Sequence, residues 1–92
     1  MLEQSGTQCR LVGDVTIETV PALLKEIRPM IRSGMNVLDC SAVLHVDSSA
    51  LAFFLTCKRE ALQHKHNLDI VKLPASLMSL ASLYGINDLL VV

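Results

Sequence analysis

The spacing of hydrophobic positions changes several times along the chain. Short stretches with alternating apolar and polar residues, or with clustered Val and Leu, predict strands, whereas apolar residues at intervals of three and four predict helices. The expected strands are 7–12, 36–40, 43–46, 68–73 and 89–92. The expected helices are one that begins at Val20 and is closed by Gly34, then 50–66 and 76–84. Strands that alternate with helices predict an α/β fold, with helices packed on a small mixed or partly parallel sheet.

The expected helix ends carry suitable capping residues. Thr19 can act as the N-cap of the first helix, and Gly34 and Gly85 can close the first and third helices. Pro29 removes one helical hydrogen bond, so the last turn of the first helix is expected to kink or shorten. The stretches 36–40 and 43–46 are rich in Val and Leu, which is typical of strands covered on both faces.

Length and hydropathy indicate a small domain that works with a partner. The chain has 92 residues, 51% of them hydrophobic, and a mean hydropathy of +0.45, so residues 1–92 are expected to form a single domain. A domain of this size buries only about 60–65% of its unfolded surface. Some apolar residues should therefore remain exposed, which usually marks a partner surface. The longest apolar run, 50–55, is far shorter than the roughly 20 residues of a membrane-spanning helix.

Charge and cysteine usage narrow the function classes. A net charge of -1 and 3% aromatic residues argue against nucleic-acid binding. Cys9, Cys40 and Cys57 form no CxxC pair and follow no secretory signal, so reduced thiols in the cytoplasm are expected. His64 and His66 lie near no cysteine in the sequence, and we expect neither a metal site nor a cofactor.

The densest polar cluster, 45–49, lies where a strand is expected to end and a helix to begin. One interpretation is structural, because Asp47 or Ser48 could serve only as a helix N-cap. The other is functional, because such junctions lie at the carboxyl edge of an α/β sheet, where sites tend to form. A phosphate on Ser48 would be compatible with the helix dipole but not with an apolar or acidic partner. Ser48 is therefore a candidate phosphorylation site.

Catalysis does not fit this cluster. His45, Asp47 and Ser48 are too close along the chain to face one another as base, orienting group and nucleophile. The sequence contains neither a GxSxG elbow nor a GxxxxGK[ST] loop. We therefore expect a protein that is not an enzyme.

Phe53 is unexpected under a helical projection of 50–66. If the inner face is defined by Leu51, Phe54, Leu55, Ala61 and Leu62, Phe53 lies on the opposite side with Thr56 and Glu60, at about 100° per residue. Either the helix is buried over more than one stripe, or Phe53 belongs to an outward patch next to Ser48 and Ser49. We take the second interpretation as the expectation, with Phe53 and Thr56 in a partner-binding surface.

The chain resembles STAS domains, which occur in anti-sigma-factor antagonists and at the cytoplasmic ends of sulfate transporters. Residues 11–15 (Leu-Val-Gly-Asp-Val) resemble the family's L-x-G-E-L segment, and residues 37–41 resemble its V-L-D-L-S strand. Residues 46–51 (Val-Asp-Ser-Ser-Ala-Leu) resemble the D-S-S/A-G-L signature, the most specific of the three. By this resemblance, Ser48 takes the place of the serine that an anti-sigma kinase phosphorylates in SpoIIAA-type proteins.

Two departures shift the likeness toward a second branch of the family. Thr16 stands where an acidic residue usually ends the first segment, and Ala50 replaces the glycine of the signature. Residues 73–86 are similar to the P-x-x-L-x-x-L-A-x-L-Y-G/N pattern of the STAS subunit of Mla-type phospholipid ABC transporters. The chain is thus most similar to MlaB-like proteins.

The resemblance implies a non-catalytic cytoplasmic subunit, peripheral to the inner membrane through its partner. That partner would be the ATPase subunit of a phospholipid-transporting ABC transporter, which the chain would regulate or stabilise. Asp47, Ser48 and Ser49 would form the polar centre of the contact, and Phe53 and Thr56 would extend it. The alternative is an anti-sigma-factor antagonist in a partner-switching module, with Ser48 as the phosphoacceptor.

Overall fold

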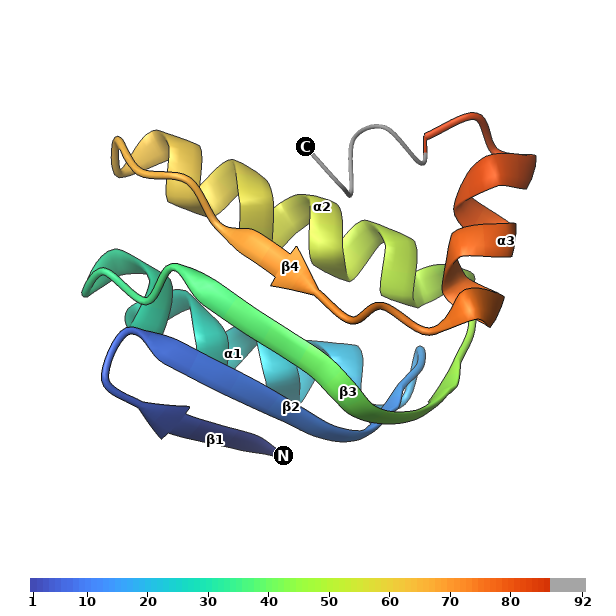
Figure 1. The fold of residues 1–92 in the computed structure, drawn as a ribbon, viewed down its shortest axis with the longest axis horizontal. Coiled ribbons are helices and arrows are strands. Elements are labelled where there is room, and N and C mark those ends of the chain that lie inside the picture. Colours follow the sequence, from blue (N-terminus) through green and yellow to red (C-terminus); the bar gives the residue numbers. More distant parts are fainter. Residues whose placement is uncertain (87–92) are drawn as a thin grey trace.

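The protein has the α/β fold that the sequence predicts, and its computed structural model describes residues 1–86. The sheet has the strand order β1-β2-β3-β4. β1 runs antiparallel to β2, whereas β2, β3 and β4 are parallel, so the sheet is mixed (Figure 1). The elements are, in chain order, β1 (Leu2–Ser5), β2 (Gln8–Val15), α1 (Val20–Arg32), β3 (Val37–Val46), α2 (Ser48–Gln63), β4 (Asp69–Val71) and α3 (Ala75–Leu83). The expected strand 89–92 lies outside the described residues.

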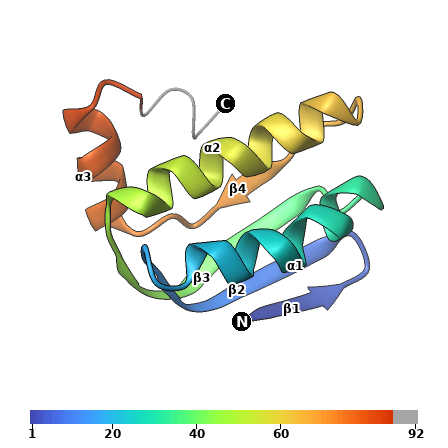
Figure 2. The same ribbon diagram turned by 180° about the vertical axis from the view of Figure 1, so that it is seen from behind.

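The two long helices, α1 and α2, cover one face of the sheet (Figures 1 and 2). Leu38 and Cys40 of β3 point into the core between the two layers, whereas Asp39 is only half-buried and Ser41 is exposed. The expectation that this strand is covered on both faces is therefore wrong. Its Val and Leu content reflects a one-sided core and an outer face that keeps some apolar residues.

Two strands differ from the sequence-based expectation. The predicted pieces 36–40 and 43–46 form one strand, β3, because β2 pairs with it along its whole length with two register shifts. β1 was not predicted, since Leu2 is the one apolar residue among its four. Its position is set by pairing with β2, where Leu2 lies opposite Leu11 and Ser5 opposite Gln8.

The helix ends follow the predicted residues, with one change in chemistry. Thr19 is at the N-cap position of α1, but its hydroxyl accepts from the N–H of Thr16 (2.9 Å) and donates to the carbonyl of Asp14 (2.9 Å). It therefore stabilises the turn before the helix. Gly34 follows α1 with a φ of 106°, which glycine adopts without strain. Pro29 lies inside α1 and does not end it, because the helix continues to Arg32.

The inner face of α2 agrees with the helical projection at Leu51, Phe54 and Ala61, which are buried, and differs from it at Leu62. Phe54, Cys57 and Ala61 face the core, whereas Leu62 is 67% exposed. The helix packs against the sheet and also contacts α1 and α3. The buried arc of α2 is therefore wide; it includes Phe53 and Cys57, which the projection left out, and it excludes Leu62.

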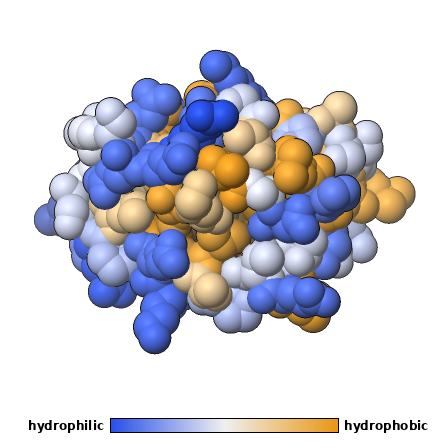
Figure 3. Space-filling model, turned by 90° about the horizontal axis from the view of Figure 1, so that it is seen from below, coloured by the Kyte–Doolittle hydropathy of each residue, from blue (hydrophilic) through white to orange (hydrophobic). Residues whose placement is uncertain are grey.

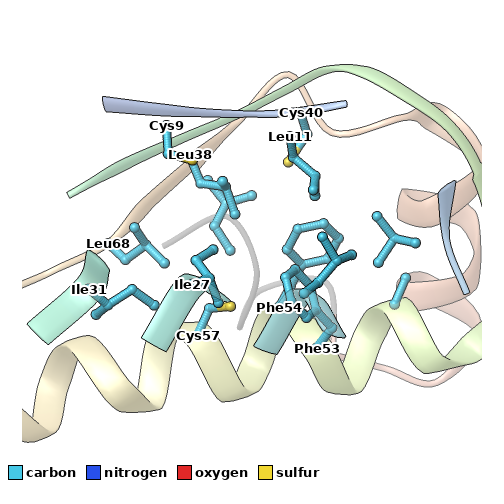
Figure 4. Close-up of a cluster of buried hydrophobic side chains, with 14 of the residues drawn as sticks. Cys9, Leu11, Ile27, Ile31, Leu38, Cys40, Phe53, Phe54, Cys57 and Leu68 are labelled. Carbon is cyan, nitrogen blue, oxygen red and sulfur yellow. The ribbon is translucent and has the colours of Figure 1, made fainter. Parts of the chain in front are cut away.

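Phe53 is fully buried, and the expectation that it forms an outward patch is wrong. Its exposed fraction is 0%, like that of Phe54, and the two rings meet edge to face with centroids 5.1 Å apart. Figure 4 shows both rings in the same buried cluster as Leu11 and Ile27. The alternative interpretation, a helix buried over more than one stripe, is the correct one. No helix within residues 1–86 has the length and apolar character needed to span a membrane.

Candidate functional site

The candidate site lies at the end of the molecule where β2 and β3 finish and α2 begins. β3 ends at Val46, Asp47 is the single linking residue, and Ser48 is the first residue of α2. The segment that follows β2 lies beside this junction, because the backbone N–H of Ile17 donates to Asp47. The site therefore consists of two loops at the carboxyl edge of parallel strands, where sites tend to form in α/β folds.

Asp47 holds the two loops together and caps α2. One carboxylate oxygen accepts from the N–H of Ile17 at 3.0 Å, and the other accepts from the N–H of Ser49 at 2.9 Å. These bonds favour the charged carboxylate and hold the pKa of Asp47 below its ordinary value, the bond from Ile17 contributing most. The capping interpretation is thus correct for Asp47, and it is compatible with a functional role for its neighbour.

Ser48 has no capping role and is open to a partner. It is exposed, and its hydroxyl has no hydrogen-bond partner within residues 1–86. Because it lies in the first turn of α2, its side chain sits in the positive potential of the helix N-terminus. Ser49 is half-buried and donates its N–H to Asp47. The sequence-predicted residues Asp47, Ser48 and Ser49 therefore form one site, in which Ser48 is the accessible member.

Two other predicted residues lie away from this site. Phe53 is in the core and has no surface to offer a partner. Thr56 is half-buried, and its hydroxyl donates to the carbonyl of Ala52 at 2.7 Å. Eight residues separate Thr56 from Ser48, which is about 12 Å along the helix axis.

One exposed apolar residue that the sequence analysis did not single out, Ile17, borders the junction, and a second, Leu44, lies further back on β3. Ile17 is 71% exposed and Leu44 is 72% exposed. Ile17 is fixed by the hydrogen bond to Asp47, and Leu44 is near the end of β3, four residues before Ser48. At the right-hand end of Figure 3, the end where α2 begins in Figure 1, hydrophobic residues reach the surface. An isolated Ile between Thr16 and Glu18 gives no periodic signal, so the sequence offered only its position beside the signature.

The polar groups around the junction form no catalytic or metal-binding set. His45 Nδ1 is 3.0 Å from Asp14 Oδ1, so that the ring is engaged with β2 and not with Ser48. Within residues 1–86, no group of three His, Cys, Asp or Glu side chains is arranged to hold a metal ion.

The fold is shared with solved structures of other proteins. The anti-sigma factor antagonist SpoIIAA in its unphosphorylated form superposes with a TM-score of 0.73 at 16% identity, over 96% of this chain and 82% of that chain. The Mglu structure gives a TM-score of 0.61 at 16% identity, over 82% of this chain and 20% of that chain. At this identity the likeness concerns the fold alone. A search of curated protein sequences gave no match.

The sequence itself assigns the family. The model of the family described as "Mlab, STAS domain" matches residues 2–92, which includes the segments whose resemblance to STAS domains is described above. The chain thus belongs to the Mlab STAS-domain family.

Proposed function

We propose that the protein is a non-catalytic subunit that binds the ATPase of a phospholipid-transporting ABC transporter and regulates or stabilises it. One observation carries the proposal: Ser48 is exposed at the start of α2, where hydrogen bonds to Asp47 fix the helix N-terminus. The chain that contains it belongs to the Mlab STAS family. Asp47 positions the serine, and Ile17 and Leu44 supply the apolar area first assigned to Phe53. Thr56 stays a predicted contact, two turns further along α2.

Such a subunit acts through differential binding. A partner that binds one conformation of the ATPase more tightly increases the population of that conformation. Binding also raises the apparent stability of both folded proteins by mass action. The chain needs no chemistry of its own for either effect. It would act at the cytoplasmic side of the inner membrane, where it is held by the ATPase.

The identity of the partner is tested by purification from native cells. A tagged chain should recover an ABC-type ATPase together with its permease, whereas a Ser48→Glu variant should recover much less of both. Ser5→Glu provides the matched control, because Ser5 is also exposed and lies in the β1–β2 hairpin at the other end of the strands. Recovery of a kinase in place of an ATPase would contradict the proposal.

A second candidate is supported by the accessibility of Ser48. A phosphate there would gain from the helix dipole and would add roughly 1.5–2 negative charges at the centre of the surface. The domain would then act as an anti-sigma-factor antagonist that an anti-sigma kinase phosphorylates. Intact-mass measurement of the native chain separates the two functions. A Ser48 phosphate, together with co-purification of a kinase, supports partner switching.

A further inference from the structure

A cluster of charged side chains lies where α1 and α2 pack against each other, away from the junction at Ser48. Glu60 of α2 has a side chain that is only 10% exposed, and it sits between α1 and α2. Arg28 Nε is 3.6 Å from Glu60 Oε1, Arg32 Nε is 3.6 Å from Oε2, and His64 Nε2 is 3.1 Å from Oε2. The Glu60 carboxylate thus contacts two guanidinium groups of α1 and the imidazole of His64, which follows α2.

This cluster has more positive than negative charge. Arg28 and Arg32 carry two charges against one on Glu60, and protonation of His64 adds a third. The two guanidinium groups contact Glu60 through Nε, and their side chains are 47% and 55% exposed. Their terminal nitrogens therefore remain available in a partly fixed orientation. Guanidinium groups held in this way are suited to a second carboxylate.

Three further exposed cations lie on the same two helices or just after them. Lys25 is exposed one turn before Arg28 on α1, and Arg59 and Lys65 are exposed near the end of α2. Within the described residues, no carboxylate lies within ion-pair distance of these three side chains. Figure 2 shows α1 and α2 side by side on this face. The protein has a net charge of -1, so this positive region reflects a separation of charge within the molecule.

We propose that this basic surface, formed by Lys25, Arg28, Arg32, Arg59, His64 and Lys65, binds an extended acidic segment of a partner protein. Arg28 and Arg32 are about 6 Å apart along α1, close to the spacing of roughly 6.7 Å between alternate side chains of an extended chain. A segment with a carboxylate at every second position matches that spacing.

A membrane surface fits less well. Peripheral helices that bind bilayers combine cations with apolar side chains that enter the interface. The exposed residues of α1 include no large apolar side chain and include the acidic Glu26, and Leu62 of α2 is the single exposed large apolar side chain on these two helices. The acidic segment is therefore the occupant that the charges of this face favour.

The proposal is tested by an NMR titration, in which a peptide of alternating glutamate and serine is added to isotopically labelled protein. The expected result is shifts of the Arg28 and Arg32 side-chain signals, with an affinity that falls as ionic strength rises. An Arg28→Gln/Arg32→Gln variant should bind about tenfold more weakly. Arg10→Gln is the matched control, because Arg10 is similarly exposed on β2 and pairs with Glu3; its affinity should change less than about twofold.

Two further variants separate a loss of peptide binding from a loss of folding. Lys25→Gln does not touch Glu60, and Arg28→Lys/Arg32→Lys retains the charge while removing the planar donors. Both should fold normally by thermal melting and should weaken peptide binding measurably. Three results would overturn the proposal. The first is a loss of peptide affinity in Arg10→Gln as large as that in Arg28→Gln/Arg32→Gln. The others are no peptide binding at low ionic strength, and binding to phosphatidylglycerol vesicles without binding to the peptide. None of these outcomes depends on the ATPase partner.

Discussion

Removal of the Phe53 ring tests the packing of α2 most severely. Phe53 has an exposed fraction of 0% and an edge-to-face contact with Phe54. Truncation of a buried Phe to Ala costs about 3–5 kcal/mol, because the cavity does not close completely. A chain of this length is stabilised by about 5–14 kcal/mol in total. We therefore expect Phe53→Ala to remove a large part of the free energy of unfolding.

The assay is urea denaturation monitored by circular dichroism. Fluorescence is less suitable, because the chain has no Trp and only one Tyr. Leu62→Ala is the control on the same helix, because Leu62 is 67% exposed. It should change the free energy of unfolding by no more than about 0.5 kcal/mol. A loss below about 1 kcal/mol for Phe53→Ala, at an unchanged denaturant slope, would refute the account of α2 packing.

Two other predictions concern groups with shifted pKa values. The charged form of Asp47 is favoured in the fold, so its contribution is present above pH 3.8 and is lost as pH falls through its lowered pKa. Urea denaturation should show that Asp47→Asn destabilises the protein near neutral pH, and that its deficit shrinks in acid; a constant deficit would contradict this. Burial raises the pKa of Cys40 and Cys57 to about 12. Alkylation should therefore be slow in the native protein at about pH 8 and fast after unfolding, and rapid native labelling would argue against their burial.

The sequence predicted the elements whose signal is local. The α/β alternation, the ends of α1 and α3, and Asp47 as a helix cap follow from periodicity and capping chemistry, which act over a few residues. β1 could not be predicted, since a four-residue edge strand with one apolar residue is specified by its partner strand. The break expected within β3 is absent for the same reason, because pairing with β2 continues across it.

Phe53 shows why the direction of a helix is harder to predict than its presence. The sequence projection correctly placed Leu51, Phe54 and Ala61 on the inner face of α2, but it also placed Leu62 inside and Phe53 outside, and both of those were wrong. Burial on a wide arc depends on neighbouring elements that are distant in the sequence. Glu60 illustrates the same point, since its place in the helix interface depends on Arg28 and Arg32 from α1.

The exposed surface around Ser48 was only partly predictable. The resemblance of the D-S-S-A-L segment to the STAS signature singled out Ser48, and the change from a strand pattern to a helical pattern placed it at a strand–helix junction. Ile17 carried no periodic signal, and Leu44 lay in a stretch expected to be covered on both faces, so the exposure of both depends on how two separate strands end. The hydrogen bond from Ile17 to Asp47 joins those ends, and it lies across 30 residues of sequence.

The most direct test of the central claim is the affinity of purified ATPase for the wild-type protein and for Ser48→Glu and Ser5→Glu. If Ser48 lies at the centre of the contact, Ser48→Glu should weaken binding more than tenfold, which is more than about 1.4 kcal/mol. Its free energy of unfolding should stay close to that of the wild type, because an acidic side chain is compatible with a helix N-terminus. Ser5→Glu should bind like the wild type. Equal affinity for all three proteins would contradict a contact centred on Ser48.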